Sequence, residues 1–347
     1  MTGWQALAWF GCRQSKLPIN LPALHEQTLS MIARLTRFMI LLQLLTLAGL
    51  STLFLSLGWA DTLTIGFLYA IAMMKLLRAS IIFNNFFLSG ALRQPMGNGQ
   101  RAPLTAASAR MLQEFWYSMV CWFQLFPLAR PFHIHFAGDA DPPVLLLHGY
   151  GANSGFWKPL SEQLTQFGVS HAAVDLEPLL GSVDDYAELI ETSAQQLCRD
   201  NGVETIVIVG HSMGGLAARA WLRRYGAARL ECMITLGTPH FGSTLAGYGM
   251  GENARQMLPP VSGTSRENHW LTVLASSESP AVRARMRSIY SRHDNIVSPQ
   301  QSAQLPGATN IEVDLIGHVA LGFDSDVMAL LMTEITLARQ SRCSAGN

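Results

Sequence analysis

The sequence predicts an α/β fold with a mostly parallel sheet and helices on both faces, preceded by an N-terminal transmembrane helical region. From about residue 142 to residue 340, short and uniformly apolar strand-like runs alternate with helical runs. This alternation is typical of a parallel sheet that is covered on both faces. Before residue 130 the chain instead carries long apolar stretches, which a soluble domain rarely contains. We therefore expect a membrane region followed by a globular domain.

Composition excludes several classes of protein. The 24 Lys and Arg residues balance 24 Asp and Glu residues, so no basic field favours nucleic acid as a partner. The five cysteines are scattered and lack CxxC or Cys/His spacing: Cys12, Cys121, Cys198, Cys232 and Cys343. We therefore expect neither a disulfide framework nor a metal site.

Residues 38–60 form a run of 23 residues without a charge. A helix needs about 20 such residues to cross a bilayer, so we expect a transmembrane helix here. A buried core helix of this length would show a polar face. A cleaved signal peptide is disfavoured because 37 residues precede the run and no small-residue cleavage site follows it.

A second apolar run begins at residue 62 and predicts a shorter span over about residues 62–77. Basic residues flank the two runs and are missing from the turn between them: Arg34, Arg37, Lys75 and Arg78. Because basic residues stay on the cytoplasmic side, a hairpin with both ends in the cytoplasm is favoured over a single span. A single span would deliver the rest of the chain across the membrane. We expect an integral protein, in a bacterial inner membrane, whose globular domain faces the cytoplasm.

The sequence predicts three regions: a membrane region over 1–93, a linker with an interfacial helix over 94–130, and a domain over 131–341. Proline and glycine make residues 94–109 resemble a linker. Residues 114–132 are rich in Trp, Tyr and Phe, which suit the headgroup boundary of a membrane. A helix in the membrane interface is our first interpretation, and a helix packed on the following domain is the alternative.

Apolar runs predict strands over residues 142–150, 170–176, 203–210, 230–237, 285–291 and 310–317. Apolar residues at helical spacing predict helices over residues 157–168, 184–202, 215–226 and 324–340. Each strand is therefore separated from the next by a helix or a long connection, as parallel pairing requires.

Residues 210–214 read Gly-His-Ser-Met-Gly at the junction of a predicted strand and helix. This is the G-x-S-x-G pattern, in which a sharp turn strains the serine backbone and small glycines leave room for it. Ser212 Oγ would then stand exposed at a helix N-terminus, where the dipole and the N–H groups favour an oxyanion. A purely structural serine is the alternative, which the strand-turn-helix context disfavours.

A nucleophilic serine needs a general base, and the base needs an orienting acid. Two residues that follow predicted strands supply them after Ser212 in the chain: Asp294 and His318. His240 is the rival base and Asp175 the rival acid, while we interpret His293 as a loop residue. The oxyanion donors would be the N–H of Met213 and, from the glycine-rich loop over 148–155, the N–H of Tyr150. A plain tight turn is the alternative for that loop.

Five segments carry a resemblance to a known family: "LLLHGYGAN" (145–153), "VGHSMGGLAAR" (209–219), "TLGTPHFGS" (235–243), "IYSRHDNIVSP" (289–299) and "GHVALGF" (317–323). Together they resemble α/β-hydrolases of the bacterial lipase and esterase type over about residues 142–340, in the family's order. The resemblance implies an α/β-hydrolase fold, a triad of Ser212, Asp294 and His318, and oxyanion N–H groups from Tyr150 and Met213. It implies no cofactor.

Residues 244–283 resemble the insertion that carries the lid in lipases. They mix glycine and proline with apolar anchors, namely Met250, Met257, Leu258, Trp270 and Leu271, as a movable cover over an acyl pocket would. A plain connection with one helix is the alternative.

The leading hypothesis is a membrane-anchored serine hydrolase that cleaves carboxylic esters of lipid-like substrates through an acyl-enzyme. Its partners would be a lipid or ester substrate and the bilayer. A thioesterase, a peptidase or another acyl transferase is an alternative, because one triad serves all these reactions. A non-catalytic membrane scaffold is a second alternative, because fold does not fix function.

Overall fold

The computed structural model describes residues 18–21, 29–91, 104–260 and 269–340. Within these residues one sheet has the strand order β1-β2-β4-β3-β5-β6-β7-β8. Its strands are β1 Ile19–Leu21, β2 Phe132–His135, β3 Val144–Leu147, β4 His171–Val174, β5 Ile206–His211, β6 Leu230–Leu236, β7 Met286–Ser291 and β8 Thr309–Val313. Neighbours from β4 to β8 are parallel, and only β1–β2 and β2–β4 are antiparallel. The predicted α/β fold with a mostly parallel sheet is confirmed.

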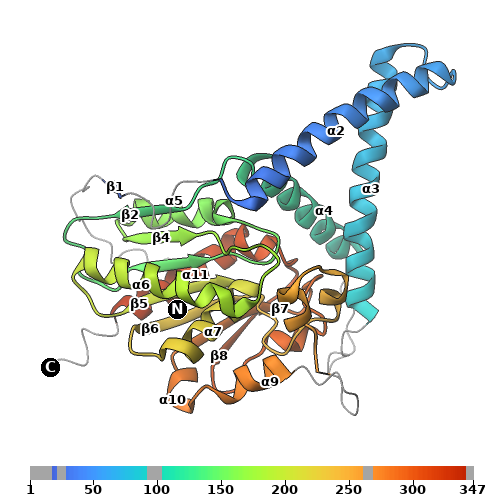
Figure 1. Ribbon diagram of the computed structural model, residues 1–347. Helices are drawn as coiled ribbons and strands as arrows, with labels where there is room; N and C mark the ends of the chain where they lie inside the picture. Colours follow the sequence, from blue (N-terminus) through green and yellow to red (C-terminus); the bar gives the residue numbers. More distant parts are fainter. Residues whose placement is uncertain (1–17, 22–28, 92–103, 261–268, 341–347) are drawn as a thin grey trace.

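Helices cover both faces of the sheet (Figure 1). They are α5 Lys158–Gln166, α6 Tyr186–Asn201, α7 Met213–Tyr225 and α11 Ser325–Gln340. Side chains alternate along a strand, so Leu145 and Leu147 of β3 join the core beneath α6 and α7. Val144 and Leu146 join the core beneath α5 and α11. Burial on both faces explains why these strands are apolar at every position.

The strand β2, which lies between β1 and β4 near one edge of the sheet, was not predicted, and neither was the edge strand β1. The strand β2 has four residues, of which only His133 is buried, and it pairs antiparallel with β4. A short strand with one buried residue shows little of the apolar run by which the central strands are recognised. Several predicted strands are also shorter in the structure, because β3 ends at Leu147 and β8 ends at Val313.

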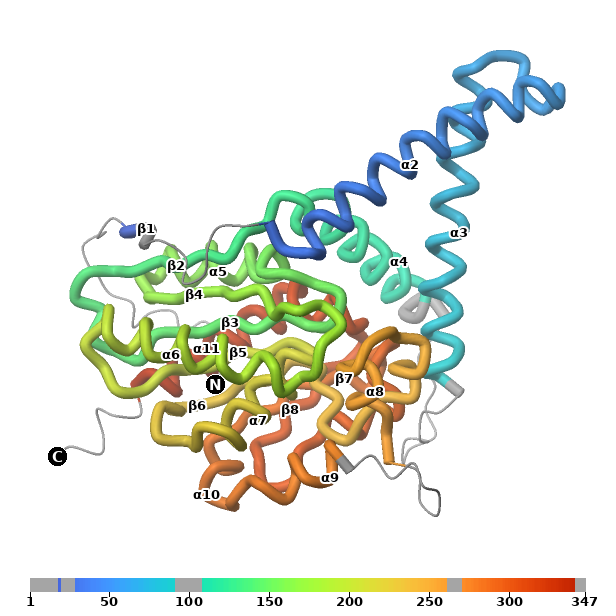
Figure 2. The backbone as a smooth tube through the Cα atoms, in the orientation of Figure 1, coloured from blue at the N-terminus to red at the C-terminus, as the bar shows by residue number. Residues whose placement is uncertain are grey.

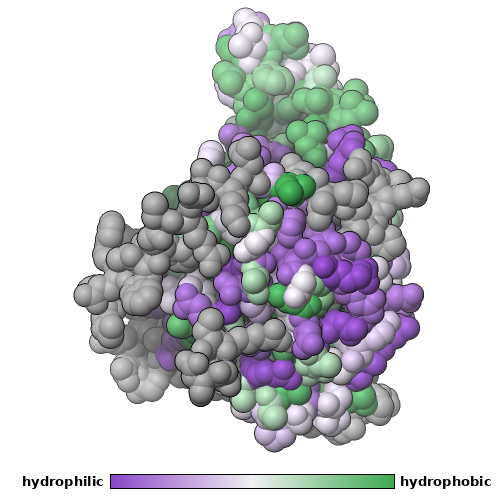
Figure 3. Space-filling model, turned by 90° about the vertical axis from the view of Figure 1, so that its left-hand side faces the viewer, coloured by the Kyte–Doolittle hydropathy of each residue, from purple (hydrophilic) through white to green (hydrophobic). Residues whose placement is uncertain are grey.

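Two long helices, α2 Met31–Ser56 and α3 Leu63–Ala91, form a hairpin that projects from the domain (Figures 1 and 2). Both are long and apolar enough to cross a membrane, by length and composition. At their contact a side chain on Gly66 would stand 2.6 Å from the carbonyl oxygen of Ser51, so glycine permits the close approach. Figure 3 shows that hydrophobic residues dominate the projecting part.

The second helix is much longer than the predicted span over 62–77. It continues through Lys75 and Arg78 to Ala91, because lysine and arginine are good helix formers and the residues beyond them are again apolar. The Arg78 guanidinium lies over the rings of Trp122 and Phe123, 5.7 and 5.2 Å from their centroids. The C-terminal part of α3 is thereby held against the segment that leads into the domain.

That segment is helical too. The helix α4 covers Leu104–Val120 and continues into a π-helical turn, η1 Cys121–Leu125. The predicted linker over 94–109 is therefore wrong from residue 104 onward, and residues 92–103 lie outside the described residues. One face of α4 packs on the domain through Glu114 and through Tyr117, which stacks on Phe323. The opposite face leaves Leu112 and Trp116 exposed by 69% and 62%, so α4 combines features of both interpretations.

Candidate active site

Ser212 occupies a strained turn between β5 and α7. Its backbone has φ 54° and ψ −123°, which costs a non-glycine residue about 1–3 kcal/mol. Hydrogen bonds hold this conformation: Ser212 N donates to Leu236 O at 2.8 Å, and Thr238 Oγ1 donates to Ser212 O at 2.9 Å. The serine thus stands at the N-terminus of α7, at the carboxyl edge of the parallel sheet.

The two glycines of the motif allow the sharp turn. A side chain on Gly210 would stand 2.7 Å from the backbone nitrogen of Gly215, and one on Gly214 would overlap the carbonyl oxygen of Leu147. Real Cβ atoms essentially never make such contacts. Glycine at both positions therefore lets α7 fold back against β5 and β3.

His318 and Asp294 form a buried pair. Asp294 follows β7, His318 follows β8, and the distance between His318 Nδ1 and Asp294 Oδ2 is 2.7 Å. Asp294 Oδ1 accepts hydrogen bonds from the N–H groups of Ile296 at 2.8 Å and Val297 at 2.7 Å. Because an ionised carboxylate can only accept, the proton of a neutral His318 lies on Nδ1. Its Nε2 is then the atom available to act as a base.

The pair and the serine meet at the same edge of the sheet. Leu236, whose carbonyl oxygen accepts the N–H of Ser212, is followed by Gly237. A side chain on Gly237 would stand 3.1 Å from Asp294 Oδ2 and 3.2 Å from His318 Nδ1. His211, the neighbour of Ser212, lies with its ring centroid 4.7 Å from that of His318. The structure therefore brings the predicted Ser212, His318 and Asp294 into one neighbourhood.

The environment of His318 changes its basicity. Burial lowers the pKa of the imidazole, but the charge and hydrogen bond of Asp294 raise it, with a smaller contribution from Glu114. The net pKa of His318 is raised above its ordinary value. A neutral imidazole with a raised pKa is a stronger base than a free imidazole.

The predicted oxyanion donors belong to the start of α7 and to the turn that follows β3. Met213 is the first residue of α7, so its N–H has no partner within the helix. The turn that carries Tyr150 is in close contact with the serine: a side chain on Gly149 would stand 3.0 Å from Ser212 Cβ. His148 holds this turn: its Nδ1 lies 2.9 Å from Gly149 O, and its Nε2 accepts the N–H of Leu176 at 2.8 Å.

The rival base lies elsewhere. His240 is fully buried, with Nε2 3.2 Å from Thr235 Oγ1 and Nδ1 3.4 Å from an amino group of Arg219. Burial, together with the charges of Arg219 and Arg283, lowers the pKa of His240 well below its ordinary value. A neutral, enclosed imidazole of this kind supports the packing of the loop that follows β6.

The rival acid and the remaining histidine also bind other groups. Asp175 Oδ1 accepts the N–H of Ser154 at 2.6 Å, which ties the end of β4 to the glycine-rich loop. His293 lies 2.8 Å from Asp314, which agrees with its interpretation as a loop residue. Both residues therefore have partners outside the His318–Asp294 pair.

The insertion over 244–283 is anchored at several points. It contains η4 Thr244–Tyr248, α8 Glu252–Gln256, α9 His269–Ser276 and α10 Pro280–Arg283, and residues 261–268 lie outside the described residues. Of the predicted anchors, Met257 and Leu271 are buried in the domain core, whereas Met250 is exposed. The Tyr150 hydroxyl donates to Met250 O and accepts from Met250 N, both at 2.9 Å. The insertion is therefore joined to the predicted oxyanion turn.

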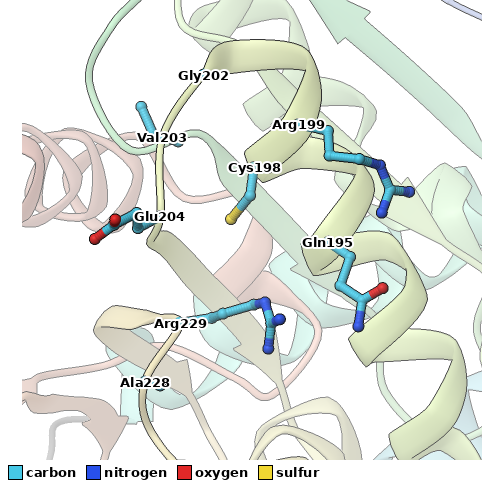
Figure 4. A pocket seen from close by; sticks show the side chains of 8 residues that line it. All are labelled: Gln195, Cys198, Arg199, Gly202, Val203, Glu204, Ala228 and Arg229. Carbon is cyan, nitrogen blue, oxygen red and sulfur yellow. The ribbon is translucent and has the colours of Figure 1, made fainter.

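Figure 4 shows a surface depression whose lining includes none of the predicted site residues. Its lining residues are Gln195, Cys198, Arg199, Gly202, Val203, Glu204, Ala228 and Arg229. They precede β5 and β6 or end α6, so the depression opens at the amino edge of the sheet. Ser212 lies at the opposite, carboxyl edge, so this depression cannot hold the acyl group of an ester that is attacked by Ser212.

Sequence reasoning missed three residues that contact His318 or its loop. His211 Nε2 lies 3.1 Å from His318 O, and Asn295 Oδ1 accepts the N–H of His318 at 2.9 Å. His211 and Asn295 are sequence neighbours of the predicted residues Ser212 and Asp294, so their place near the site could have been predicted. The third, Glu114, lies in α4 and accepts the N–H groups of the two residues after His318. Nothing in its local sequence indicated that contact.

No three His, Cys, Asp or Glu side chains gather as metal ligands would within the described part of the chain. That no metal or cofactor is needed stays a prediction.

Known proteins resemble the domain. A family model described as the alpha/beta hydrolase fold matches residues 142–267. The pimeloyl-(acyl-carrier protein) methyl ester esterase of Pseudoalteromonas atlantica is 38% identical over 193 residues, which cover 52% of this chain and 69% of that protein. An enzyme of the same name from Vibrio vulnificus is 26% identical over 184 residues, covering 51% of this chain and 70% of that protein. A mature Bacillus licheniformis lipase, of known crystal structure, is 19% identical with a TM-score of 0.49, covering 57% of this chain and 93% of that one.

The chain belongs to the α/β-hydrolase family. It is a hydrolase of this fold, and its relatives include carboxylic-ester hydrolases. The helices α2 and α3 lie outside the residues that the family model matches.

Proposed function

We propose that this protein is a membrane-anchored serine hydrolase that cleaves carboxylic esters of lipid-like substrates through an acyl-enzyme on Ser212. The observation that carries the proposal is the strained Ser212 turn beside the buried His318–Asp294 pair. Relatives named as ester hydrolases support the reaction class. A scaffold without catalytic function would not need a strained serine at this position, because such strain persists only where the surroundings maintain it.

In the first half-reaction, His318 Nε2 accepts the hydroxyl proton of Ser212 as Oγ attacks the ester carbonyl carbon. The carbon–oxygen double bond opens, and its electron pair moves onto the carbonyl oxygen. When the tetrahedral intermediate collapses, the bond to the alcohol oxygen breaks and His318 returns the proton to that oxygen. The products of this step are the free alcohol and a Ser212 ester.

In the second half-reaction a water molecule takes the place of the alcohol. His318 accepts one proton from the water as the water oxygen attacks the acyl carbon. The bond between the acyl carbon and Ser212 Oγ then breaks, and His318 returns the proton to Oγ, which releases the carboxylic acid. The N–H groups of Met213 and Tyr150 would stabilise the negative oxygen in both halves. Removing one such donor typically costs about 2.7–4 kcal/mol of transition-state stabilisation.

The membrane anchor would be the hairpin of α2 and α3. Its helices expose large apolar side chains along their length: Phe38, Leu41, Leu44, Leu45, Leu68, Leu76, Ile81 and Phe87. Lipid tails would cover this apolar surface, whose exposure to water is unfavourable. An anchor of this kind keeps the site close to substrates that partition into a bilayer, and this is our reason for proposing lipid-like esters.

A series of esters with increasing acyl length tests the substrate class. For the purified full-length protein in mixed micelles, we expect kcat/KM to rise from acetyl to medium or long chains, because each buried methylene adds about 0.8 kcal/mol. The matching thioesters provide the comparison. A preference for acetyl esters would contradict lipid-like substrates, and hydrolysis of thioesters alone would replace the ester reaction by a thioesterase.

Carbonate extraction and reporter fusions test the anchor. We expect alkaline carbonate to leave the protein in the membrane, because two spanning helices are not released by high pH. A fluorescent protein fused after Asn98 should fluoresce and a phosphatase fused there should be inactive, whereas a phosphatase placed after Asp61, in the turn, should be active. An active phosphatase after Asn98 would overturn the hairpin and move the domain outside, and release by carbonate would exclude spanning.

A further inference from the structure

A carboxylate from outside the sheet and its covering helices reaches the loop of His318. Glu114 of α4 is only 1% exposed. Its Oε1 accepts the N–H of Val319, and its Oε2 accepts the N–H of Ala320, both at 3.0 Å. A side chain on Gly317 would overlap Oε2, so glycine at that position lets the loop close around the carboxylate. Residues on both sides of His318 therefore touch Glu114.

The backbone of His318 itself is held by two other groups. Its N–H donates to Asn295 Oδ1 at 2.9 Å, and its carbonyl oxygen lies 3.1 Å from His211 Nε2. Asn295 and His211 come from the domain's own loops, next to Asp294 and Ser212. Glu114 alone among these three comes from the helices that precede the domain, and it binds the backbone that continues from His318 toward α11.

The acid is also connected to the same helices. Gln300 Nε2 donates to Asp294 O at 2.9 Å, and it lies 3.4 Å from Ser89 O, near the end of α3. The helix α3 in turn packs on α4. Both members of the His318–Asp294 pair thus have a contact that leads to the N-terminal helices.

We propose that Glu114 is a positioning residue that fixes the loop of His318, so that its imidazole keeps its reach to Ser212. The proposal rests on the proposed catalytic role of His318. A carboxylate presents two acceptor oxygens to two successive N–H groups, whereas an amide has one acceptor and places an NH₂ group against the second N–H. A loop that loses one of these bonds is free to shift, and a misplacement of about 1 Å can cost on the order of 10²-fold in rate.

The test compares three variants of the full-length protein. Glu114→Gln should lower kcat by roughly 10- to 100-fold and leave KM unchanged, because Glu114 is buried and its carboxyl group binds the loop backbone. Glu114→Asp keeps the carboxyl group but is one methylene shorter, and it should also lower kcat because it cannot reach both N–H groups. The matched control is Glu191→Gln, which replaces another buried glutamate, one that binds Trp221 Nε1 at 2.8 Å on the α6 side of the sheet. It should keep the wild-type kcat even if it melts at a lower temperature.

Wild-type kcat in both Glu114 variants would overturn the proposal, and so would a rise in KM with kcat unchanged. If the Glu114 variants do not fold, hydrogen exchange of the wild-type protein decides: the amides of Val319 and Ala320 should be strongly protected, and fast exchange at both would contradict the contact. The outcome is separable from that of the proposed function, because an inactive wild-type protein would refute the hydrolase and not the position of the loop.

Discussion

Ser212→Ala should abolish ester hydrolysis and leave the protein folded. Without Oγ no acyl-enzyme forms, and the residual rate comes only from substrate binding and the oxyanion donors, so we expect a loss of roughly four to six orders of magnitude in kcat. Alanine keeps a Cβ at φ 54°, so the strain of the turn and the melting temperature should change little. Steady-state hydrolysis and thermal melting of the same preparation measure both quantities.

Ser212→Gly is the matched control. Glycine also lacks the hydroxyl, but it adopts a positive φ without steric cost, so this variant should be as inactive as alanine and more stable by about 1 kcal/mol or more. Activity and stability would then change in different directions at a single position. Hydrolysis by either variant at a rate near wild type would show that Ser212 is not the nucleophile.

His318→Ala and Asp294→Asn should each lower kcat/KM by orders of magnitude, with His318→Ala the more damaging. His318→Ala removes the proposed base. Asp294→Asn leaves the imidazole in place but no longer keeps the imidazole proton on Nδ1. The corresponding change lowers kcat by about 10⁴-fold in a well-studied triad. His240→Ala, which removes a buried imidazole outside the site, should instead lower the melting temperature while most activity remains. An inactive His240→Ala with an active His318→Ala would reassign the base.

The pH dependence of kcat/KM reports on the same pair. The proposed base, His318, can accept a proton only in its neutral form, and its pKa is raised above its ordinary value mainly by Asp294 against the opposing effect of burial. Activity should therefore fall as the pH drops through a value above about 6.5, the ordinary pKa of histidine. In Asp294→Asn the raising charge is gone, so the remaining activity should fall only at a lower pH. If the activity of Asp294→Asn instead fell at a higher pH than that of the wild type, the result would contradict the pairing of His318 with Asp294.

Local sequence patterns were sufficient for most of the domain. The central strands are apolar at every position because both faces are covered, and this leaves a clear signal in the sequence. The turn at Ser212 was predictable because Gly210 and Gly214 are required by close backbone contacts. Asp294 and His318 could be chosen because each follows a strand, and the carboxyl ends of parallel strands meet at one edge.

The remaining features depend on contacts between distant parts of the chain. The strand β2 has only one buried residue, and it is a strand because it pairs with β1 on one side and β4 on the other. The length of α3 could not be read from the apolar run, because Lys75 and Arg78 interrupt the hydrophobic pattern without ending the helix. Glu114 stands about 200 residues from the loop that it contacts, so only the folded structure reveals its place.

The most direct measurement of the central claim is the covalent labelling of the purified full-length protein with a fluorophosphonate, followed by mass spectrometry of its peptides. The phosphorus of such a probe mimics the ester carbonyl carbon and traps the serine that attacks it. We expect one phosphonyl group per chain, on Ser212, with hydrolysis lost in proportion to labelling and with much slower labelling in His318→Ala. A label on a different serine, or full hydrolysis in protein that carries the label on Ser212, would contradict the account.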